Sequence, residues 1–191
     1  DDFKPAWSFT GFHTCSLPRY EDAIASYDKA VEIKPDYHEA WYNRGVSLEN
    51  LGRHEDAIAS YDKAIEVKPD YHYAVAHRGD AYRRLGNHQQ ALADLNRAID
   101  LKPDYDWAIA TRAQTYAQLQ QYDETLQDLD RAIEIDPDYI WASEYRGEIY
   151  LWQHRYADAL NVLNKRLEES DNDWVFYLRA LATAKIAHAD T

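Results

Sequence analysis

Four prolines recur at a fixed spacing of 34 residues. They are Pro35, Pro69, Pro103 and Pro137, and the phrases around them read IKPDY, VKPDY, LKPDY and IDPDY. Residues 21–38 and 55–72 are identical at 16 of 18 positions. Self-similarity at one period of this length indicates a repeat architecture, in which each copy is a structural unit that stacks on the next. The spacing divides the chain into the repeats 4–37, 38–71, 72–105, 106–139 and 140–173.

Within each repeat, apolar and small residues follow two helical stripes. The stripes fall at positions 4, 8 and 11 and at positions 20, 24 and 27 of the repeat, which is i, i+4, i+7 spacing. In repeat 38–71 they are Trp41, Gly45 and Leu48, and then Ala57, Tyr61 and Ala64. The small residues predict a close approach of two helices. Gly52 and Gly86 fit a left-handed helix cap after the first stripe, and the recurring proline ends the second helix.

This pattern resembles the tetratricopeptide repeat (TPR) family, whose motif of 34 residues runs W-x2-L-G-x2-Y, then A-x3-F, then P. Against this motif, repeat 38–71 reads Trp41, Arg44, Gly45, Leu48, Ala57, Tyr61 and Pro69, and the resemblance extends from residue 4 to about residue 188. It implies an all-α fold, a right-handed α-solenoid of five TPR helical hairpins plus a C-terminal helix at 173–188. Eleven helices are therefore expected.

One departure from the family pattern recurs at position 7, where the usual leucine is replaced by Arg44, Arg78, Arg112 and Arg146. We interpret these arginines as framework residues that lay their stems on the core and send their guanidinium groups to carboxylates. Position 29 is acidic in every repeat and position 26 is basic. Surface pairs of this kind contribute a few tenths of a kcal/mol each.

The two ends of the array are less regular. Residues 9–14 (FTGFHT) are poor helix formers, so the first helix of repeat 4–37 is predicted to be its least stable part. The helix at 173–188 is apolar nearly all round, and we expect it to pack on a neighbouring domain or subunit. The sequence has no methionine and no visible signal peptide. It is therefore expected to be a segment of a longer protein whose true N-terminus is missing.

Composition narrows the class of partner and the compartment. The formal net charge of −13 disfavours binding to nucleic acid and to anionic membrane surfaces. No apolar run approaches the length of about 18 residues that a membrane-spanning helix needs. The single cysteine, Cys15, cannot form an internal disulfide and fits a reducing compartment, so a cytoplasmic location is expected.

No catalytic constellation is visible. The sequence lacks a glycine-rich phosphate loop and the H-E-x-x-H, C-x-x-C and G-x-S-x-G motifs. Most of the eight histidines recur because the repeat recurs, and no two are spaced i, i+4 as metal ligands on one helix face would be. We therefore predict a protein that is not an enzyme and that has no cofactor and no metal site.

The resemblance implies that the first helices line a concave face, with positions 2, 5, 6, 9, 12 and 13 of each repeat pointing into it. The peptide-binding residues predicted on this basis are Glu39, Tyr42, Asn43, Tyr73, His77, Asp80, Arg83, Trp107, Thr111, Gln114, Trp141, Glu144, Tyr145 and Glu148. The aromatic row at position 2, Tyr73, Trp107 and Trp141, can contact a ligand, pack on the nearby tyrosine of the preceding loop, or do both, and these interpretations stay open. Acidic residues outnumber arginines in this set, which favours a basic and apolar peptide.

One subclass of the family can be compared directly. Chaperone-binding TPR domains hold a terminal carboxylate with lysine, asparagine and arginine side chains from three consecutive repeats. Only Asn43 matches that set here, so this mode of binding is not expected. The sequence thus predicts a scaffold that binds a peptide or helix of a partner protein in its groove. The alternative is a regulatory or sensing arm of a larger enzyme, which would dock on its own catalytic domain.

Overall fold

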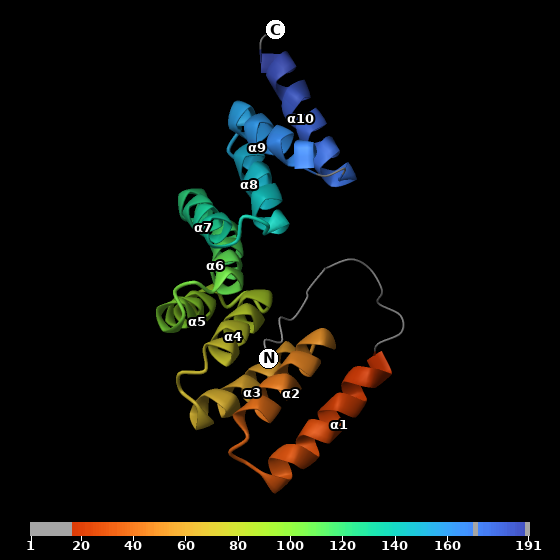
Figure 1. The fold of residues 1–191 in the computed structure, drawn as a ribbon, viewed down its shortest axis with the longest axis vertical. Helices are drawn as coiled ribbons and strands as arrows, with labels where there is room; N and C mark the ends of the chain where they lie inside the picture. The colour runs from red at the N-terminus through yellow and green to blue at the C-terminus, as the bar shows by residue number, and fades with distance from the viewer. Residues whose placement is uncertain (1–16, 170–171, 190–191) are drawn as a thin grey trace. The chain divides into compact units, whose positions relative to one another are not determined.

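The computed structural model describes residues 17–169 and 172–189, and these residues form α-helices joined by short turns (Figure 1). The helices are α1 (Leu17–Ile33), α2 (His38–Asn50), α3 (His54–Val67), α4 (His72–Arg84), α5 (His88–Leu101), α6 (Asp106–Gln118), α7 (Tyr122–Ile135), α8 (Ile140–Trp152), α9 (Tyr156–Glu169) and α10 (Asp173–Ala189). The predicted all-α fold is confirmed. The first helix of repeat 4–37 and Cys15 lie outside the described residues.

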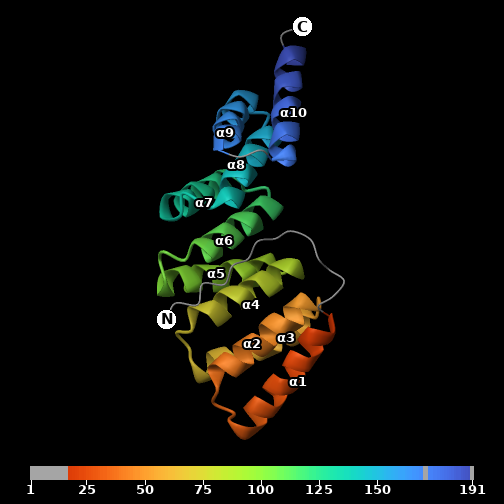
Figure 2. The same cartoon turned by 45° about the vertical axis from the view of Figure 1, so that its right-hand side comes forward.

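Each repeat from residue 38 onward contributes an A helix and a B helix, which pack against each other: α2 with α3, α4 with α5, α6 with α7, and α8 with α9. The chain divides into an N-terminal unit, residues 1–69, and a C-terminal unit, residues 70–191. The N-terminal unit contains α1 to α3. The C-terminal unit contains α4 to α10, stacked in sequence order (Figure 2).

The turn between the A and B helices has the same geometry in every described hairpin. Gly52 and Gly86 have φ values of 72° and 78°, and Gln120 and His154 take the left-handed conformation at the same position, with φ values of 58° and 60°. The amide of the next residue then donates to a carbonyl five residues back, as from Asn87 to Tyr82 at 2.9 Å. This is the Schellman cap, so the predicted role of the glycines is confirmed and extends to two other side chains.

The small residue at position 8 of each A helix lies against the large residue at position 24 of its B helix. A Cβ atom on Gly79 would lie 3.0 Å from Leu95 Cγ, and one on Gly147 would lie 2.8 Å from Leu163 Cδ2. Leu95 and Leu163 are both 0% exposed. The predicted close approach is therefore present, and it depends on the missing side chain.

The arginines at position 7 pair with carboxylates, as predicted, but not with the acidic residues at position 29. Arg78 and Arg112 hold Asp94 and Asp128, at position 23 of their own repeats, with bidentate hydrogen bonds of 2.6–2.8 Å. Arg112 also donates to Asn96 on the preceding B helix at 2.6 Å. The guanidinium group therefore joins an A helix to the two B helices that flank it.

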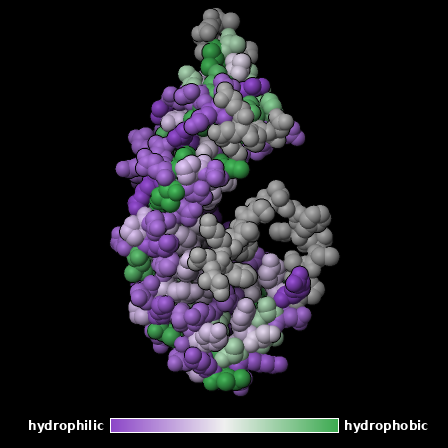
Figure 3. Space-filling view, in the orientation of Figure 1, coloured by the Kyte–Doolittle hydropathy of each residue, from purple (hydrophilic) through white to green (hydrophobic). Residues whose placement is uncertain are grey.

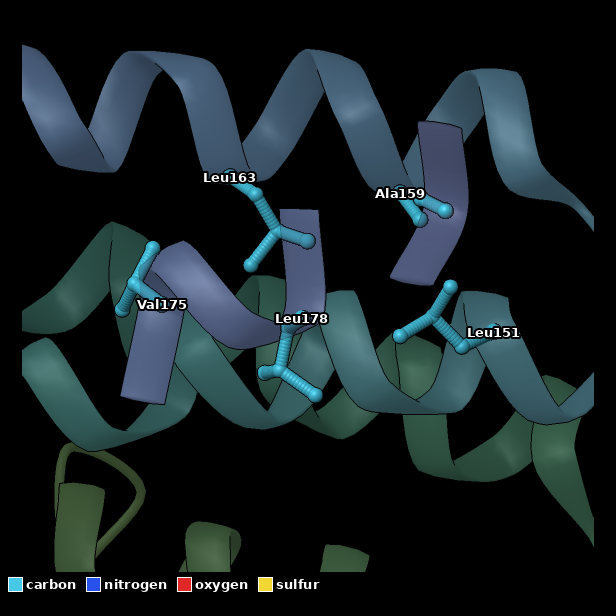
Figure 4. Close-up of a cluster of buried hydrophobic side chains, with 6 residues drawn as sticks. Leu151, Ala159, Leu163, Val175 and Leu178 are labelled. Carbon is cyan, nitrogen blue, oxygen red and sulfur yellow. The ribbon is translucent and has the colours of Figure 1, made fainter. Parts of the chain in front are cut away.

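The last helix completes the core of the C-terminal unit by packing on α9 and α8. Val175 and Leu178 of α10 lie against Leu163 and Ala159 of α9 and Leu151 of α8 (Figure 4). None of the helices among the described residues combines the length and the apolarity that crossing a bilayer requires.

Candidate functional site

The C-terminal unit has two adjoining pockets on its A helices and α10. The first, the polar pocket, has a volume of about 300 Å³ and is lined by Arg83, Gln114, Gln118, Trp141, Tyr145 and Glu148. The second, the aromatic pocket, has a volume of about 330 Å³ and is lined by Glu148, Leu151, Trp152, His154, Tyr156, Trp174, Tyr177, Leu178, Leu181 and Lys185. Glu148 borders both. Five of the six residues around the polar pocket belong to the predicted binding set.

The charge of Arg83 at the polar pocket is held by a buried carboxylate one turn away. Asp80 is 5% exposed and accepts hydrogen bonds from Arg83 Nε at 2.8 Å and from Arg84 Nε at 2.7 Å. Burial alone would raise the pKa of Asp80, but attraction to the two arginines and their hydrogen bonds outweigh it and hold the pKa below its usual value. Asp80 therefore fixes the guanidinium of Arg83 at the pocket wall.

Two stacked rings form the aromatic side of the polar pocket. The ring centroids of Trp141 and Tyr145 are 4.8 Å apart with an interplanar angle of 28°. Burial, reinforced by the charge of Glu148, raises the pKa of Tyr145 to about 12. The phenol is therefore neutral at physiological pH, where its hydroxyl can donate a hydrogen bond.

Glu148 connects the polar pocket to α10. Its Oε1 accepts a hydrogen bond of 2.8 Å from Trp174 Nε1, and Asn172 donates to the neighbouring Glu144 at 2.8 Å. Burial raises the pKa of Glu148, the repulsion of Glu144 adds to this, and the Trp174 hydrogen bond only partly offsets the two. The carboxylate is thus half-buried beside another acid, which is a favourable place for a cationic ligand group.

The aromatic pocket includes residues of the last helix, which the sequence analysis did not place in the binding set. Asp173-Trp174 aligns with Asp106-Trp107, so α10 has the register of an A helix. Its groove positions 2, 5, 9 and 13 are then Trp174, Tyr177, Leu181 and Lys185, and all four line the pocket. Trp174 and Tyr177 are 49% and 56% exposed, and their rings stack with centroids 5.3 Å apart. The Asp-Trp register is the sequence signal that extends the site onto α10.

The aromatic row at position 2 packs on the tyrosine before each A helix. The ring centroids are 5.7 Å apart for Tyr73 and Tyr71, 5.9 Å for Trp107 and Tyr105, and 6.0 Å for Trp141 and Tyr139. The packing interpretation is therefore correct, and it does not remove the row from the surface, because Tyr73 is 38% exposed. Trp107 also stacks on His77 at 4.5 Å, which joins two predicted residues from successive A helices.

The remaining predicted residues are divided between the two units. Glu39, Tyr42 and Asn43 belong to α2 of the N-terminal unit. Thr111, on α6, is 5% exposed and donates to the Trp107 carbonyl at 2.8 Å. Like Asp80, Thr111 is buried beneath the predicted binding face and is not available to contact a ligand.

Replacing Glu148 with glutamine should stabilise the fold at pH 7. The pKa of Glu148 is raised above the unfolded value of 4.5, so the protonated carboxyl group stabilises the folded state. This stabilisation is complete below pH 4.5 and is lost as the pH rises through the folded pKa. Glutamine keeps an acceptor for Trp174 and removes the buried charge. We expect a gain below about 1 kcal/mol, because solvent screens a half-buried group.

Urea denaturation at pH 7 and pH 4 measures this gain, and Glu124→Gln on α7, an exposed glutamate, is the matched control. The gain should disappear at pH 4 for Glu148→Gln. An equal gain in both variants would mean that it reflects overall charge and not the buried site.

Two family profiles match the chain. The profile described as tetratricopeptide repeat matches residues 38–71, and the profile described as TPR repeat matches residues 15–52, 79–120 and 113–154. No curated protein matches the chain in a sequence search.

Several solved structures share the fold. The crystal structure of MamA is 23% identical with a TM-score of 0.72, over 84% of this chain and 95% of MamA. YrrB, described as a TPR protein with an unusual peptide-binding site, is 23% identical with a TM-score of 0.70, over 86% of each chain. The first TPR of Spaghetti (RPAP3), bound to the HSP90 peptide SRMEEVD, is 25% identical with a TM-score of 0.59, over 61% of this chain and 92% of that one. The profile matches span more than half of the 191 residues, and the chain therefore belongs to the tetratricopeptide repeat family.

Proposed function

We propose that the C-terminal unit binds an extended peptide or a helix of a partner protein along α4, α6, α8 and α10. The observation that carries the proposal is the continuity of the polar and aromatic pockets, which share Glu148 and are lined at groove positions of successive helices. The protein is thus an interaction scaffold, and the side chains that line the two pockets do not make up a constellation suited to catalysis.

The pocket walls favour a ligand with basic and apolar side chains. Gln114 and Gln118 offer amides that can donate to and accept from a peptide backbone. The rings of Trp141, Trp152 and Trp174 can bind apolar side chains or cations. Glu144 and Glu148 add negative charge, and the net charge of −13 should attract a basic partner and repel nucleic acid and anionic membranes.

The similarity to peptide-binding proteins supports the class of ligand. YrrB is described as having a peptide-binding site, and the Spaghetti structure holds the peptide SRMEEVD. That peptide carries more acidic than basic residues. We expect a different ligand here, because the carboxylate-binding residues of chaperone-binding domains are not matched in the first three repeats.

The alternative function, a regulatory arm that docks on its own catalytic domain, has one observation in its favour. Phe176 and Tyr177 of α10 are 39% and 56% exposed, and a helix with large exposed apolar residues is suited to packing on another domain or subunit. The lone cysteine supports a cytoplasmic location for either function.

Peptides selected from a random display library on the whole chain should be enriched in arginine or lysine beside leucine or aromatic residues, and should bind with roughly micromolar affinity, about −8 kcal/mol. Replacing Trp107 and Trp141 together with alanine should weaken binding by about 2 kcal/mol or more, because tryptophans that are partly accessible in a groove act as binding hot spots. Affinity should fall as salt rises. Calorimetric titration measures each effect.

A matched pair of substitutions separates the groove from general damage to the fold. Gln118→Ala lies at the polar pocket, and Gln127→Ala lies on the exposed side of α7. Only the first should weaken binding. Full affinity in the double tryptophan variant, with an intact circular dichroism spectrum, would move the binding site away from this face.

A further inference from the structure

The last helix has the sequence register of an A helix but carries no B helix of its own among the described residues. Residues 106–118 read DWAIATRAQTYAQ and residues 173–185 read DWVFYLRALATAK, which agree at positions 1, 2, 7, 8 and 12. In the other repeats, positions 3 and 10 of the A helix are buried, as Ala108 and Thr115 are on α6. Positions 4, 7, 8 and 11 receive the B helix of the same repeat. For α10, the structure shows packing on α9 and α8.

The two faces of α10 differ sharply in burial. The face that packs on α9 and α8 is closed, because Val175, Leu178 and Ala182 are 0%, 4% and 0% exposed. The other face, which we call the open strip, consists of Phe176, Arg179, Ala180 and Thr183 at positions 4, 7, 8 and 11. Phe176 is 39% exposed, and Ala180 and Thr183 are also exposed. The view in Figure 3 shows hydrophobic residues at the α10 end of the unit.

The matching strip of α6 is covered by α7 at positions 4 and 8. Ile109 and Ala113, at positions 4 and 8, are both 0% exposed. Leu129 of α7, at position 24, is also 0% exposed. Ala180, at position 8 of α10, is exposed and small, so it leaves room for another helix to approach the open strip.

Arg179 is the charged residue of the open strip. Arg112 on α6 holds Asp128 of α7 with hydrogen bonds of 2.8 and 2.6 Å. Arg179, at the same position of α10, lies 5.3 Å from the ring of Phe176 and has no ion pair with a described carboxylate. A guanidinium fork is matched by a carboxylate in bidentate geometry. A helix that covers the open strip as α5 and α7 cover theirs would therefore carry an acidic residue at the position of Asp94 and Asp128.

We propose that the open strip binds an amphipathic helix of a partner protein in the antiparallel position that α7 takes on α6. The helix would place an aspartate on Arg179 and, one residue further along, a leucine over Ala180, as Asp128 and Leu129 do in repeat 106–139. The proposal rests on the role of α10 in packing on another domain or subunit, described above, and states which side chains the partner would carry. It is independent of the groove ligand, because the open strip and the pockets lie on different faces of α10.

The test uses a synthetic, fluorescently labelled peptide of residues 121–136, which contains α7, and the whole chain. Fluorescence anisotropy should show saturable binding. Changing Asp128 of the peptide to lysine should weaken binding about tenfold, because a charge-assisted bidentate pair is lost. Arg179→Glu in the chain should weaken binding of the unchanged peptide by a similar factor and restore binding of the lysine peptide.

Two control variants assign the result to the open strip. Arg155→Glu changes an exposed arginine immediately before α9 and should leave binding unchanged. The Trp107/Trp141 double variant should also leave it unchanged, so loss of the groove ligand and loss of this helix are separate outcomes. Equal affinity of the aspartate and lysine peptides for both the unchanged chain and Arg179→Glu would overturn the proposal.

A short peptide is only marginally helical in water, so a tethered form provides a second measurement. Residues 121–136 are joined after Thr191 through a flexible glycine-serine linker, which raises their effective concentration to about millimolar. Hydrogen exchange in residues 173–187 should slow at least about tenfold relative to a tether with lysine in place of aspartate. Equal exchange in the two tethered forms, together with no binding of the free peptide, would rule out the open strip as a helix-binding surface.

Discussion

Replacing Gly79 with leucine should lower the free energy of unfolding by about 1–3 kcal/mol or more, because the new side chain has no space between α4 and α5. A Cβ atom alone would lie 3.0 Å from Leu95 Cγ and 3.3 Å from the carbonyl oxygen of Ala91. Leu95 is fully buried and cannot move aside without disturbing its own neighbours. The helices must therefore separate, and the hairpin loses packing along its length. Ala98→Leu, at a residue with 0% exposure, should have a comparable cost.

Urea denaturation followed by circular dichroism measures the effect, and Gly86→Ala is the control in the same hairpin. Gly86 has a φ of +78°, and no heavy atom lies within 4 Å of the place that a Cβ atom would take. Its cost of about 1 kcal/mol should therefore come from backbone conformation alone. Unchanged stability in both Gly79→Leu and Ala98→Leu would show that these positions are not close helix contacts.

The hairpins can be predicted because the same pattern of residues recurs in several repeats. Small residues at position 8 and large residues at position 24 recur together, so the close contact follows from periodicity alone. The left-handed turn at Gly52 and Gly86 is equally clear. The same turn at Gln120 and His154 is not, because the packing of the hairpin overrides the side-chain preference at those two positions.

The partners of the arginines cannot be read from the sequence in the same way. Asp94 and Asp128 are 16 residues after Arg78 and Arg112, and which of many acidic positions faces a guanidinium depends on how the helices cross. The angle at which two helices cross, and the rotation of each helix about its axis, leave no recognisable pattern in the local sequence. An arginine and an aspartate do recur at a constant separation in two repeats, but many other acidic positions also recur.

The candidate site is predictable in outline and not in detail. Family geometry leads to Gln114, Trp141, Tyr145 and Glu148, which meet at the polar pocket with Arg83. Asp80 and Thr111 follow from the same positional rule, but each is only 5% exposed. At the aromatic pocket the rule gives Glu148 but no residue of α10, because an apolar last helix is typical of a cover and only its A-helix register points to groove positions.

Replacing Arg112 with alanine should cost about 3–5 kcal/mol, the range for breaking a buried ion pair by removing one partner. Asp128 is 5% exposed and receives two hydrogen bonds from this guanidinium, which also donates to Asn96 at 2.6 Å. The hydrogen bonds to Asp128 are the main reason that the pKa of Arg112 is raised above its usual value. Without the arginine, the carboxylate stays in the interior with its charge uncompensated, and α6 loses its polar contact with both α5 and α7.

Arg146→Ala is the matched control, because the surroundings of the same repeat position are different there. Position 23 of repeat 140–173 is Val162, and Arg146 pairs instead with Asp130, whose side chain is 50% exposed. The Nε atom of Arg146 is buried and has no hydrogen-bond partner among the residues that the structure describes. The loss should therefore be about 1 kcal/mol or less, as for an exposed pair. The double variant Arg112→Ala/Asp128→Ala should be more stable than Arg112→Ala alone, since the isolated charge is gone. Equal costs for Arg112→Ala and Arg146→Ala in urea denaturation would mean that the arginine stem stabilises the hairpin and the buried ion pair does not.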